Sequence, residues 1–275
     1  MPVCQLCHLD RELRKSHIVP EFLYADLYND KNHMMGINGQ GTRGWKPLQK
    51  GIRESLFCED CEQHFNEYCE KPFLEEWVRA KPLPDPWTTN AVFWITVNYS
   101  SFKLFHLSVL FRAGVSTLPT YSEVSLGPHQ EKLRQLLLNR DPGEFWQYPI
   151  FAYAVVHHQT KRLIPMVSQV QRSSFDGQRC YGMMYGGAEW WICVSSHRNQ
   201  AFQAAALQSD GRMPFHAVPW NELAITQATA NALWNPAPNC RIPDNHIDPR
   251  RYPLLVARSI MRGVIDELKA GRERC

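Results

Sequence analysis

No stretch of the sequence approaches the roughly 18 consecutive apolar residues that would span a bilayer. The first residues hold no basic segment followed by an apolar core, so we expect no secretory signal peptide. No P-loop, glycine-rich dinucleotide-binding turn or Ser-His-Asp motif occurs either, and the corresponding enzyme classes gain no support. We therefore expect a cytoplasmic protein with no membrane association.

An excess of charge of one sign is also absent. The 275 residues carry a formal net charge of +3, and 21% of them are charged. Such a small excess gives nucleic-acid binding no support from bulk electrostatics. Hydrophobic residues make up 44% of the chain. This composition is typical of a globular protein with one large core or two modest ones, and it excludes a disordered chain.

Four of the nine cysteines form two Cys-x-x-Cys pairs, Cys4 with Cys7 and Cys58 with Cys61. In a reducing compartment such pairs indicate metal binding or catalysis more often than disulfides. Four thiolates complete a tetrahedral shell, so we predict a structural zinc ion with no open coordination position. Any chemistry must then lie beside the metal. The remaining cysteines show no pairing pattern; they are Cys69, Cys180, Cys193, Cys240 and Cys275.

Three prolines within five residues predict a linker at residues 82–87, because proline removes backbone donors and disfavours helix. We expect a zinc module at residues 1–81 and an α+β domain at residues 88–275, which would recognise substrate, sense a signal or bind a partner. In that domain, apolar patterning predicts helices and strands. The helices are expected at residues 91–111, 129–138, 221–234 and 253–270, and the strands at 151–157, 163–170 and 189–195, with a turn at 182–187.

The zinc module can be followed in more detail. A strand over residues 11–16 would deliver His17 to its end, and a second strand over residues 51–57 would run into a helix that opens at Cys58. Knuckle, hairpin and helix around one zinc outline a treble clef, a zinc-stabilised ββα unit. We therefore predict an α+β fold with this module at the front and a larger domain of mixed helices and antiparallel sheet behind it. The module places His17 near the first helical turn, where a histidine base and a divalent cation could hydrolyse a phosphodiester.

The SHIVP segment at residues 16–20 lies between the CxxC at residues 4–7 and the LFCEDCE segment at residues 56–62. This arrangement resembles the zinc-containing branch of the HNH, or His-Me finger, endonucleases over roughly the first 80 residues. The resemblance implies that His17 is the general base. It also implies that Glu62 stands at the position of a metal-binding histidine, where it would hold Mg²⁺ or Mn²⁺.

Other positions depart from the family. Ser16 stands where the family usually has a metal-binding aspartate, and Arg53 or Glu54 falls near the asparagine that orients the base. The missing metal ligand could come from three side chains, among which the sequence does not choose. These are Glu21, Glu54 and His64.

Three functional hypotheses follow. The resemblance implies a metal-dependent endonuclease acting on nucleic acid, DNA rather than RNA, in anti-phage defence with a protein partner. The alternative is a non-catalytic zinc-finger module that binds nucleic acid or a partner protein, in which His17 only shapes the hairpin. The third is an unrelated enzyme with its site after residue 90.

Overall fold

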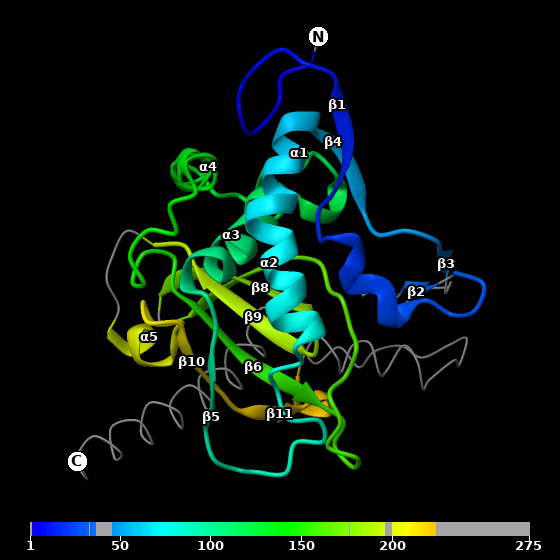
Figure 1. Ribbon diagram of the computed structural model, residues 1–275, viewed down its shortest axis with the longest axis vertical. Coiled ribbons are helices and arrows are strands. Elements are labelled where there is room, and N and C mark those ends of the chain that lie inside the picture. The colour runs from blue at the N-terminus through cyan, green and yellow to red at the C-terminus, as the bar shows by residue number, and fades with distance from the viewer. Residues whose placement is uncertain (1, 33, 37–45, 176, 196–199, 224–275) are drawn as a thin grey trace, which may run out of the picture.

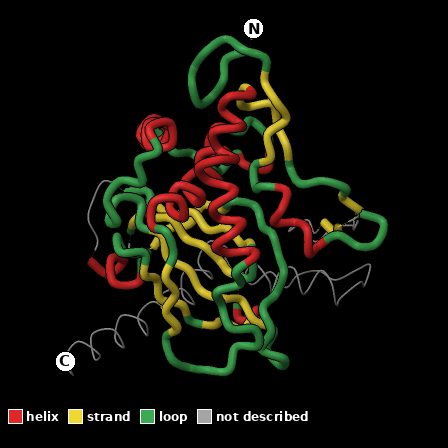
Figure 2. Tube along the Cα trace, viewed as in Figure 1, coloured by secondary structure: helices red, strands yellow, loops and turns green. Residues whose placement is uncertain are grey.

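The protein contains both helices and sheets, which confirms the predicted α+β class (Figure 1). Helices lie over one side of the largest sheet, as Figure 2 shows in red and yellow. None of the described helices combines the length and apolar character that a bilayer crossing requires. The computed structural model describes residues 2–32, 34–36, 46–175, 177–195 and 200–223.

The N-terminal unit is a two-stranded ribbon followed by a helix. Strand β1 (Leu13–His17) pairs antiparallel with β4 (Arg53–Cys58), and α1 (Glu59–Phe65) follows β4 without a break. The order of knuckle, ribbon and helix is as expected, although β1 begins two residues later than predicted. Between the two strands lie the short helix η1 (Glu21–Leu27) and the paired strands β2 (Met34–Gly36) and β3 (Lys46–Leu48).

Helix α1 continues into a long helical rod (Figure 1). Its turns widen to π-helix on both sides of Pro72, a residue that has no backbone N–H to donate to an ordinary α-helical bond. Phe65, Cys69, Phe73 and Trp77 are buried at a constant spacing of four residues along it. This stripe is the face that the rod packs on the rest of the protein. The further segments of the rod are η2 (Asn66–Glu70), α2 (Lys71–Phe73) and η3 (Leu74–Arg79).

The central helix α3 (Tyr99–Val115) is buried at every position from 102 to 113. The sequence predicted one helix over residues 91–111, and this prediction is wrong at its start. Residues Phe93–Thr96 form strand β5, which pairs with β10 (Arg212–Phe215). Aromatic and β-branched residues in this stretch favour a strand. Asn98 then caps the helix, because its side chain accepts a hydrogen bond from the backbone N–H of Ser101 at 3.1 Å.

The largest sheet has the strand order β11-β6-β9-β8-β7 and is antiparallel except for β11 beside β6. The strand expected at residues 163–170 is absent from it, apart from a single bridge between Leu163 and Val156. The turn expected at residues 182–187 is narrower, because Gly182 lies inside β8. A side chain on Gly182 would come within 3.0 Å of the Trp191 ring. The strands are β6 (Ile150–Val156), β7 (Gln171–Phe175), β8 (Gln178–Tyr185), β9 (Ala188–Cys193) and β11 (Ala217–Pro219).

Two cysteines that showed no pairing pattern face each other in this sheet. Cys180 on β8 lies directly across from Cys193 on β9, with their Cα atoms 4.2 Å apart, and they form a disulfide. The register of the two strands creates this pair. The sequence alone does not indicate this disulfide, because the two cysteines are 13 residues apart and the chain was expected to lie in the reducing cytoplasm.

Buried residues on both sides of the proline-rich segment share one core. A single cluster runs from Cys4 to Phe215, and it joins the N-terminal unit to the helices and to one face of the sheet. The Phe73 ring stacks on Phe105 with centroids 3.7 Å apart, and Trp77 contacts Trp190 of the sheet. The helical rod and α3 thus cover that face.

Four shorter helical segments complete the described part. Helix α4 (His129–Asn139) confirms the helix predicted at residues 129–138. A short 3-10 turn, η5, occupies Trp220–Glu222, at the start of the helix predicted for residues 221–234. The rest of that prediction, and the helix predicted at residues 253–270, lie outside the described residues. The other two short helices are η4 (Pro119–Tyr121) and α5 (Gln200–Ala205).

Candidate functional site

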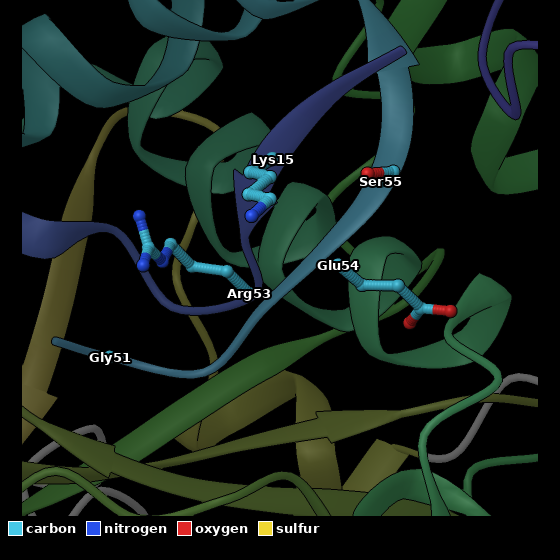
Figure 3. A pocket seen from close by; sticks show the side chains of 5 residues that line it. All are labelled: Lys15, Gly51, Arg53, Glu54 and Ser55. Atoms are coloured by element: carbon cyan, nitrogen blue, oxygen red, sulfur yellow. The ribbon is translucent and has the colours of Figure 1, made fainter.

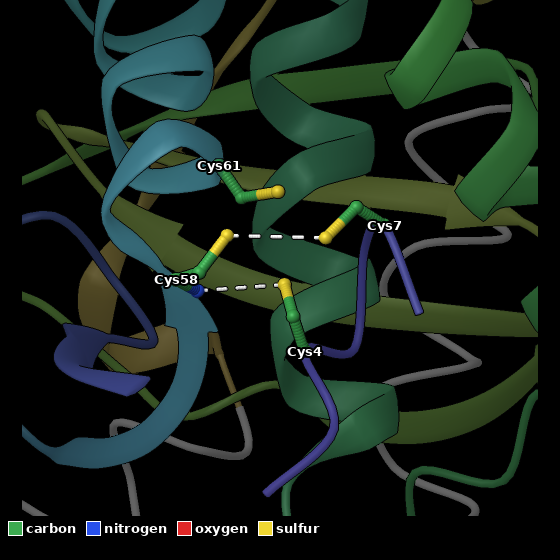
Figure 4. A group of neighbouring side chains, drawn as sticks. All are labelled: Cys4, Cys7, Cys58 and Cys61. Atoms are coloured by element: carbon green, nitrogen blue, oxygen red, sulfur yellow. Dashed lines mark hydrogen bonds between the residues drawn. The ribbon is translucent and has the colours of Figure 1, made fainter. Parts of the chain in front are cut away.

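The four predicted zinc ligands converge in space (Figure 4). The Sγ atoms of Cys4, Cys7, Cys58 and Cys61 all lie within 4.8 Å of one another. The Cys7 and Cys58 sulfurs are 3.8 Å apart. This matches the edge of a tetrahedron whose Zn–S bonds are about 2.3 Å, an edge of ~3.8 Å. The donor set therefore fits a structural metal ion in a closed thiolate shell.

The chain brings these thiols together with backbone hydrogen bonds. In the first knuckle the His8 N–H donates to the Cys4 carbonyl oxygen at 2.9 Å, and the Gln5 N–H donates to Leu56 of β4 at 3.0 Å. The second knuckle spans the end of β4 and the first turn of α1, which contributes Cys61. From α4, the Arg134 guanidinium donates to the Leu6 carbonyl oxygen at 2.5 Å. Hydrogen bonds with the β1–β4 ribbon and with α4 thus hold the first knuckle in place.

The pKa values of these thiols diverge. The hydrogen bond between Cys4 and Cys61 lowers the pKa of the Cys4 thiol and raises the pKa of the Cys61 thiol. Burial raises the pKa of the Cys7 thiol. Sulfurs this close cannot all ionise without a cation among them. Binding of a metal ion would therefore release protons.

His17 is the last residue of β1 and pairs with Arg53, at the other end of the ribbon from Cys58, which pairs with Leu13. Its Nε2 atom lies 2.7 Å from Oε2 of Glu21, which begins η1 directly after Pro20. The Tyr28 hydroxyl donates a short hydrogen bond to the other oxygen of Glu21. Within the described part of the chain, neither His17 Nε2 nor Glu21 Oε2 forms a hydrogen bond, so the contact is electrostatic, and with Nε2 held against the carboxylate Nδ1 is the ring nitrogen left to accept a proton.

The environment of the ring favours its neutral form. Burial lowers the pKa of His17 below its ordinary value of 6.5, although the Glu21 carboxylate opposes this shift. The imidazole is therefore unprotonated at neutral pH, as a general base must be. The sequence identified Glu21 only as a candidate metal ligand, and its contact with His17 depends on the turn at Pro20.

Ser16 of β1 and Glu62 of α1 are in contact. The Ser16 hydroxyl donates a short hydrogen bond to Oε1 of Glu62 in α1, and Ser16 is fully buried. Burial raises the pKa of Glu62, whereas the nearby Arg112 guanidinium and the Ser16 hydroxyl lower it. With serine at position 16, this contact supplies a single carboxylate.

A buried arginine that the sequence did not single out lies beneath the site. Arg112 of α3 donates from Nη2 to Oε1 of Glu70 at 2.5 Å and from Nη1 to the carbonyl oxygen of His17 at 3.2 Å. Its guanidinium also lies over the Phe65 ring, 4.6 Å from the centroid. Arg112 therefore ties the central helix to the end of β1. A charged residue directly after the long apolar stretch was the only sign of it in the sequence.

Two of the predicted catalytic residues are bound elsewhere. The Glu54 carboxylate accepts hydrogen bonds from Ser116 Oγ at 2.5 Å and from the Thr117 N–H at 3.1 Å, beyond the end of α3. His64 Nε2 lies 2.8 Å from the Leu137 carbonyl oxygen of α4. Within the described ranges, the four cysteines are the only group of three or more His, Cys, Asp or Glu residues that converges on one point. No multi-residue cage for Mg²⁺ or Mn²⁺ forms there.

We compared the chain with protein-family models, with curated proteins and with solved structures, and no significant match was found in any of the three. The geometry described above is therefore the basis for assigning a function.

Proposed function

We propose that this protein hydrolyses phosphodiester bonds of nucleic acid, with His17 as the general base and zinc in the four-thiol cluster. The observation that carries the proposal is the chain of contacts from Tyr28 through Glu21 to His17, at the end of β1 in a ββα unit. A base oriented by a third group is the usual sign of an activated catalytic pair.

In this proposal Nδ1 of His17 takes a proton from the attacking water. The Glu21 carboxylate then stabilises the positive ring, and Tyr28 keeps Glu21 in place. General-base help of this kind typically contributes about 10²–10⁴ in rate. The zinc shell has a structural role, because its four thiolates leave no position for water.

Glu62 is the carboxylate that would hold a catalytic Mg²⁺ or Mn²⁺, and Ser16 fixes one of its oxygens. Mg²⁺ is usually held by one or two carboxylates together with substrate phosphates and water. A single protein carboxylate is therefore chemically sufficient. When bound, such a cation would offset the charge that develops on the leaving oxygen.

A second candidate function is a non-catalytic zinc module that binds nucleic acid or a partner protein. Arg112 favours it, because this buried cation already pairs with Glu70 and lies near Glu62. The acidic groups at the site are then neutralised without a metal ion. Preference for DNA and a defence system as partner rest on the HNH resemblance alone, and location in the cytoplasm rests on the sequence features described at the outset.

The test is a cleavage assay with plasmid DNA, single-stranded DNA and RNA, each with Mg²⁺, with Mn²⁺ and with EDTA. The proposal expects cleavage only with a divalent cation, and loss of cleavage in Glu62→Gln. A control variant, His157→Ala, changes a histidine at the distant turn after β6 and should cleave like the wild type. Intact substrates under every condition, from protein whose zinc content is full, would favour the binding module.

A further inference from the structure

A shallow hollow of about 370 Å³ lies on the β1–β4 ribbon (Figure 3). The register of the ribbon determines which side chains share its face. Lys15 is paired with Ser55, and His17 is paired with Arg53. Paired residues project to the same side of a two-stranded ribbon, and alternate residues along one strand do so too. Lys15, Arg53 and the His17 ring therefore share one face.

The two cations on this face are Lys15 and Arg53. Within the part of the chain that the structure describes, neither Lys15 nor Arg53 forms a side-chain hydrogen bond or ion pair. Their neighbours differ, since Arg14 pairs with Glu59 at 2.6 Å and Arg11 pairs with Asp60. Among the described residues, Arg11 and Arg14 thus have acidic partners, whereas Lys15 and Arg53 have none.

The acidic groups near the hollow are already bound. Arg53 and Glu54 extend to opposite sides of the strand, as Figure 3 shows, and Glu54 accepts its hydrogen bonds from Ser116 and Thr117. Glu21 lies against His17 and Tyr28. The face beside the imidazole thus carries two positive charges against the one carboxylate of Glu21, and an anion is the ligand that a face with this net charge favours.

We propose that Lys15 and Arg53 bind the phosphate backbone of a nucleic-acid strand and hold it across this face, next to His17. The proposal deepens the function proposed above and rests on it. Lys15 supplies a flexible point charge, and the Arg53 guanidinium offers paired donors that match phosphate oxygens. Such contacts position a strand without reading its sequence.

Fluorescence anisotropy of labelled oligonucleotides tests this in EDTA, where cleavage cannot interfere. The full chain is titrated with single-stranded DNA, double-stranded DNA and RNA at several salt concentrations. The double variant Lys15→Gln/Arg53→Gln is compared with Arg14→Gln, a control that loses one cation already paired with Glu59. Circular dichroism and zinc content establish that each variant folds.

We expect the double variant to bind more weakly, and the slope of log K against log salt to shrink by about 1 per residue replaced. Arg14→Gln should keep the wild-type slope. Equal affinity and slope in all three proteins would overturn the inference. So would full competition by millimolar inorganic phosphate at constant ionic strength, since the face would then hold a single anion and not a strand.

The inference and the proposed function fail differently. If binding depends on Lys15 and Arg53 while no substrate is ever cut, the face binds a strand and the hydrolytic role of His17 is wrong. If the wild type cleaves and the double variant binds and cleaves equally well, hydrolysis stands and the assignment of Lys15 and Arg53 is wrong.

Discussion

Nε2 of His17 lies 2.7 Å from Oε2 of Glu21, four residues further along the chain. The contact forms because Pro20 ends the extended segment and η1 begins at once with Glu21. Tyr28, at the other end of η1, donates to the second oxygen of the same carboxylate. The ring is thus oriented by a local turn of the chain.

The His17 ring should respond to the charge of Glu21. This carboxylate raises the pKa of His17 while burial lowers it, so Glu21→Gln should move the pKa further below 6.5. Tyr28→Phe should shift it less, because Glu21 keeps its charge. NMR titration of the His17 ring in the intact protein measures both effects without any cleavage assay. An unchanged titration in Glu21→Gln would show that the two groups do not interact in solution.

The thiol cluster should hold one metal ion per chain. We expect elemental analysis to find about one zinc, and Cys58→Ser to lose it and unfold the knuckle and ribbon, because metal binding and folding are coupled in such sites. Cys69→Ser is the matched control, since Cys69 is a buried thiol of the same helical rod outside the cluster. Loss of zinc from Cys69→Ser but not from Cys58→Ser would contradict the assigned ligands.

Arg112 should contribute to the stability of the protein through its ion pair with Glu70. Arg112→Met leaves Glu70 without its cation, and breaking a buried pair typically costs about 3–5 kcal/mol. Because the Glu70 side chain is 20% exposed, we expect a loss near the lower end of this range. Arg112→Met/Glu70→Gln should recover part of the loss in urea unfolding. If the loss of unfolding free energy in the double variant equals the sum of the losses in Arg112→Met and Glu70→Gln, the pair contributes little coupling.

A buried carboxyl in the sheet should make stability depend on pH. Burial raises the pKa of Glu189 from 4.5 to about 7, although a hydrogen bond from Tyr153 opposes the shift. Between these values the folded protein binds more protons than the unfolded chain, so its free energy of unfolding falls as pH rises through this window, by about 3 kcal/mol in all.

Glu189→Gln removes this titration, so its stability should fall less between pH 4.5 and 7 than that of the wild type. Urea unfolding at several pH values measures the difference. Glu75→Gln, which changes an exposed carboxylate paired with Arg79, is the control. Parallel stability curves for Glu189→Gln and the wild type would contradict the raised pKa.

The parts of the site that the sequence predicted are those set by short-range pattern. Paired cysteines two residues apart mark each knuckle, and they predicted the thiol cluster. The helix at residues 129–138 followed from its apolar spacing. The His17 position at a strand end followed from the resemblance and from Pro20.

The parts that the sequence missed depend on partners far apart in the chain. Glu54 and Ser116 are 62 residues apart, and His64 and Leu137 are 73 apart. No local pattern shows that these contacts turn both side chains toward other elements. The same holds for the pairing of Arg112 with Glu70 and for the disulfide, each of which requires the packed fold or the strand register.

The most direct test of the account is the single-turnover cleavage rate of His17→Ala beside that of the wild type, on whichever nucleic acid the wild type cuts. A lost general base predicts a rate lower by about 10²–10⁴, with zinc content and oligonucleotide affinity unchanged. Equal rates in the two proteins would contradict the assignment of His17 as the base.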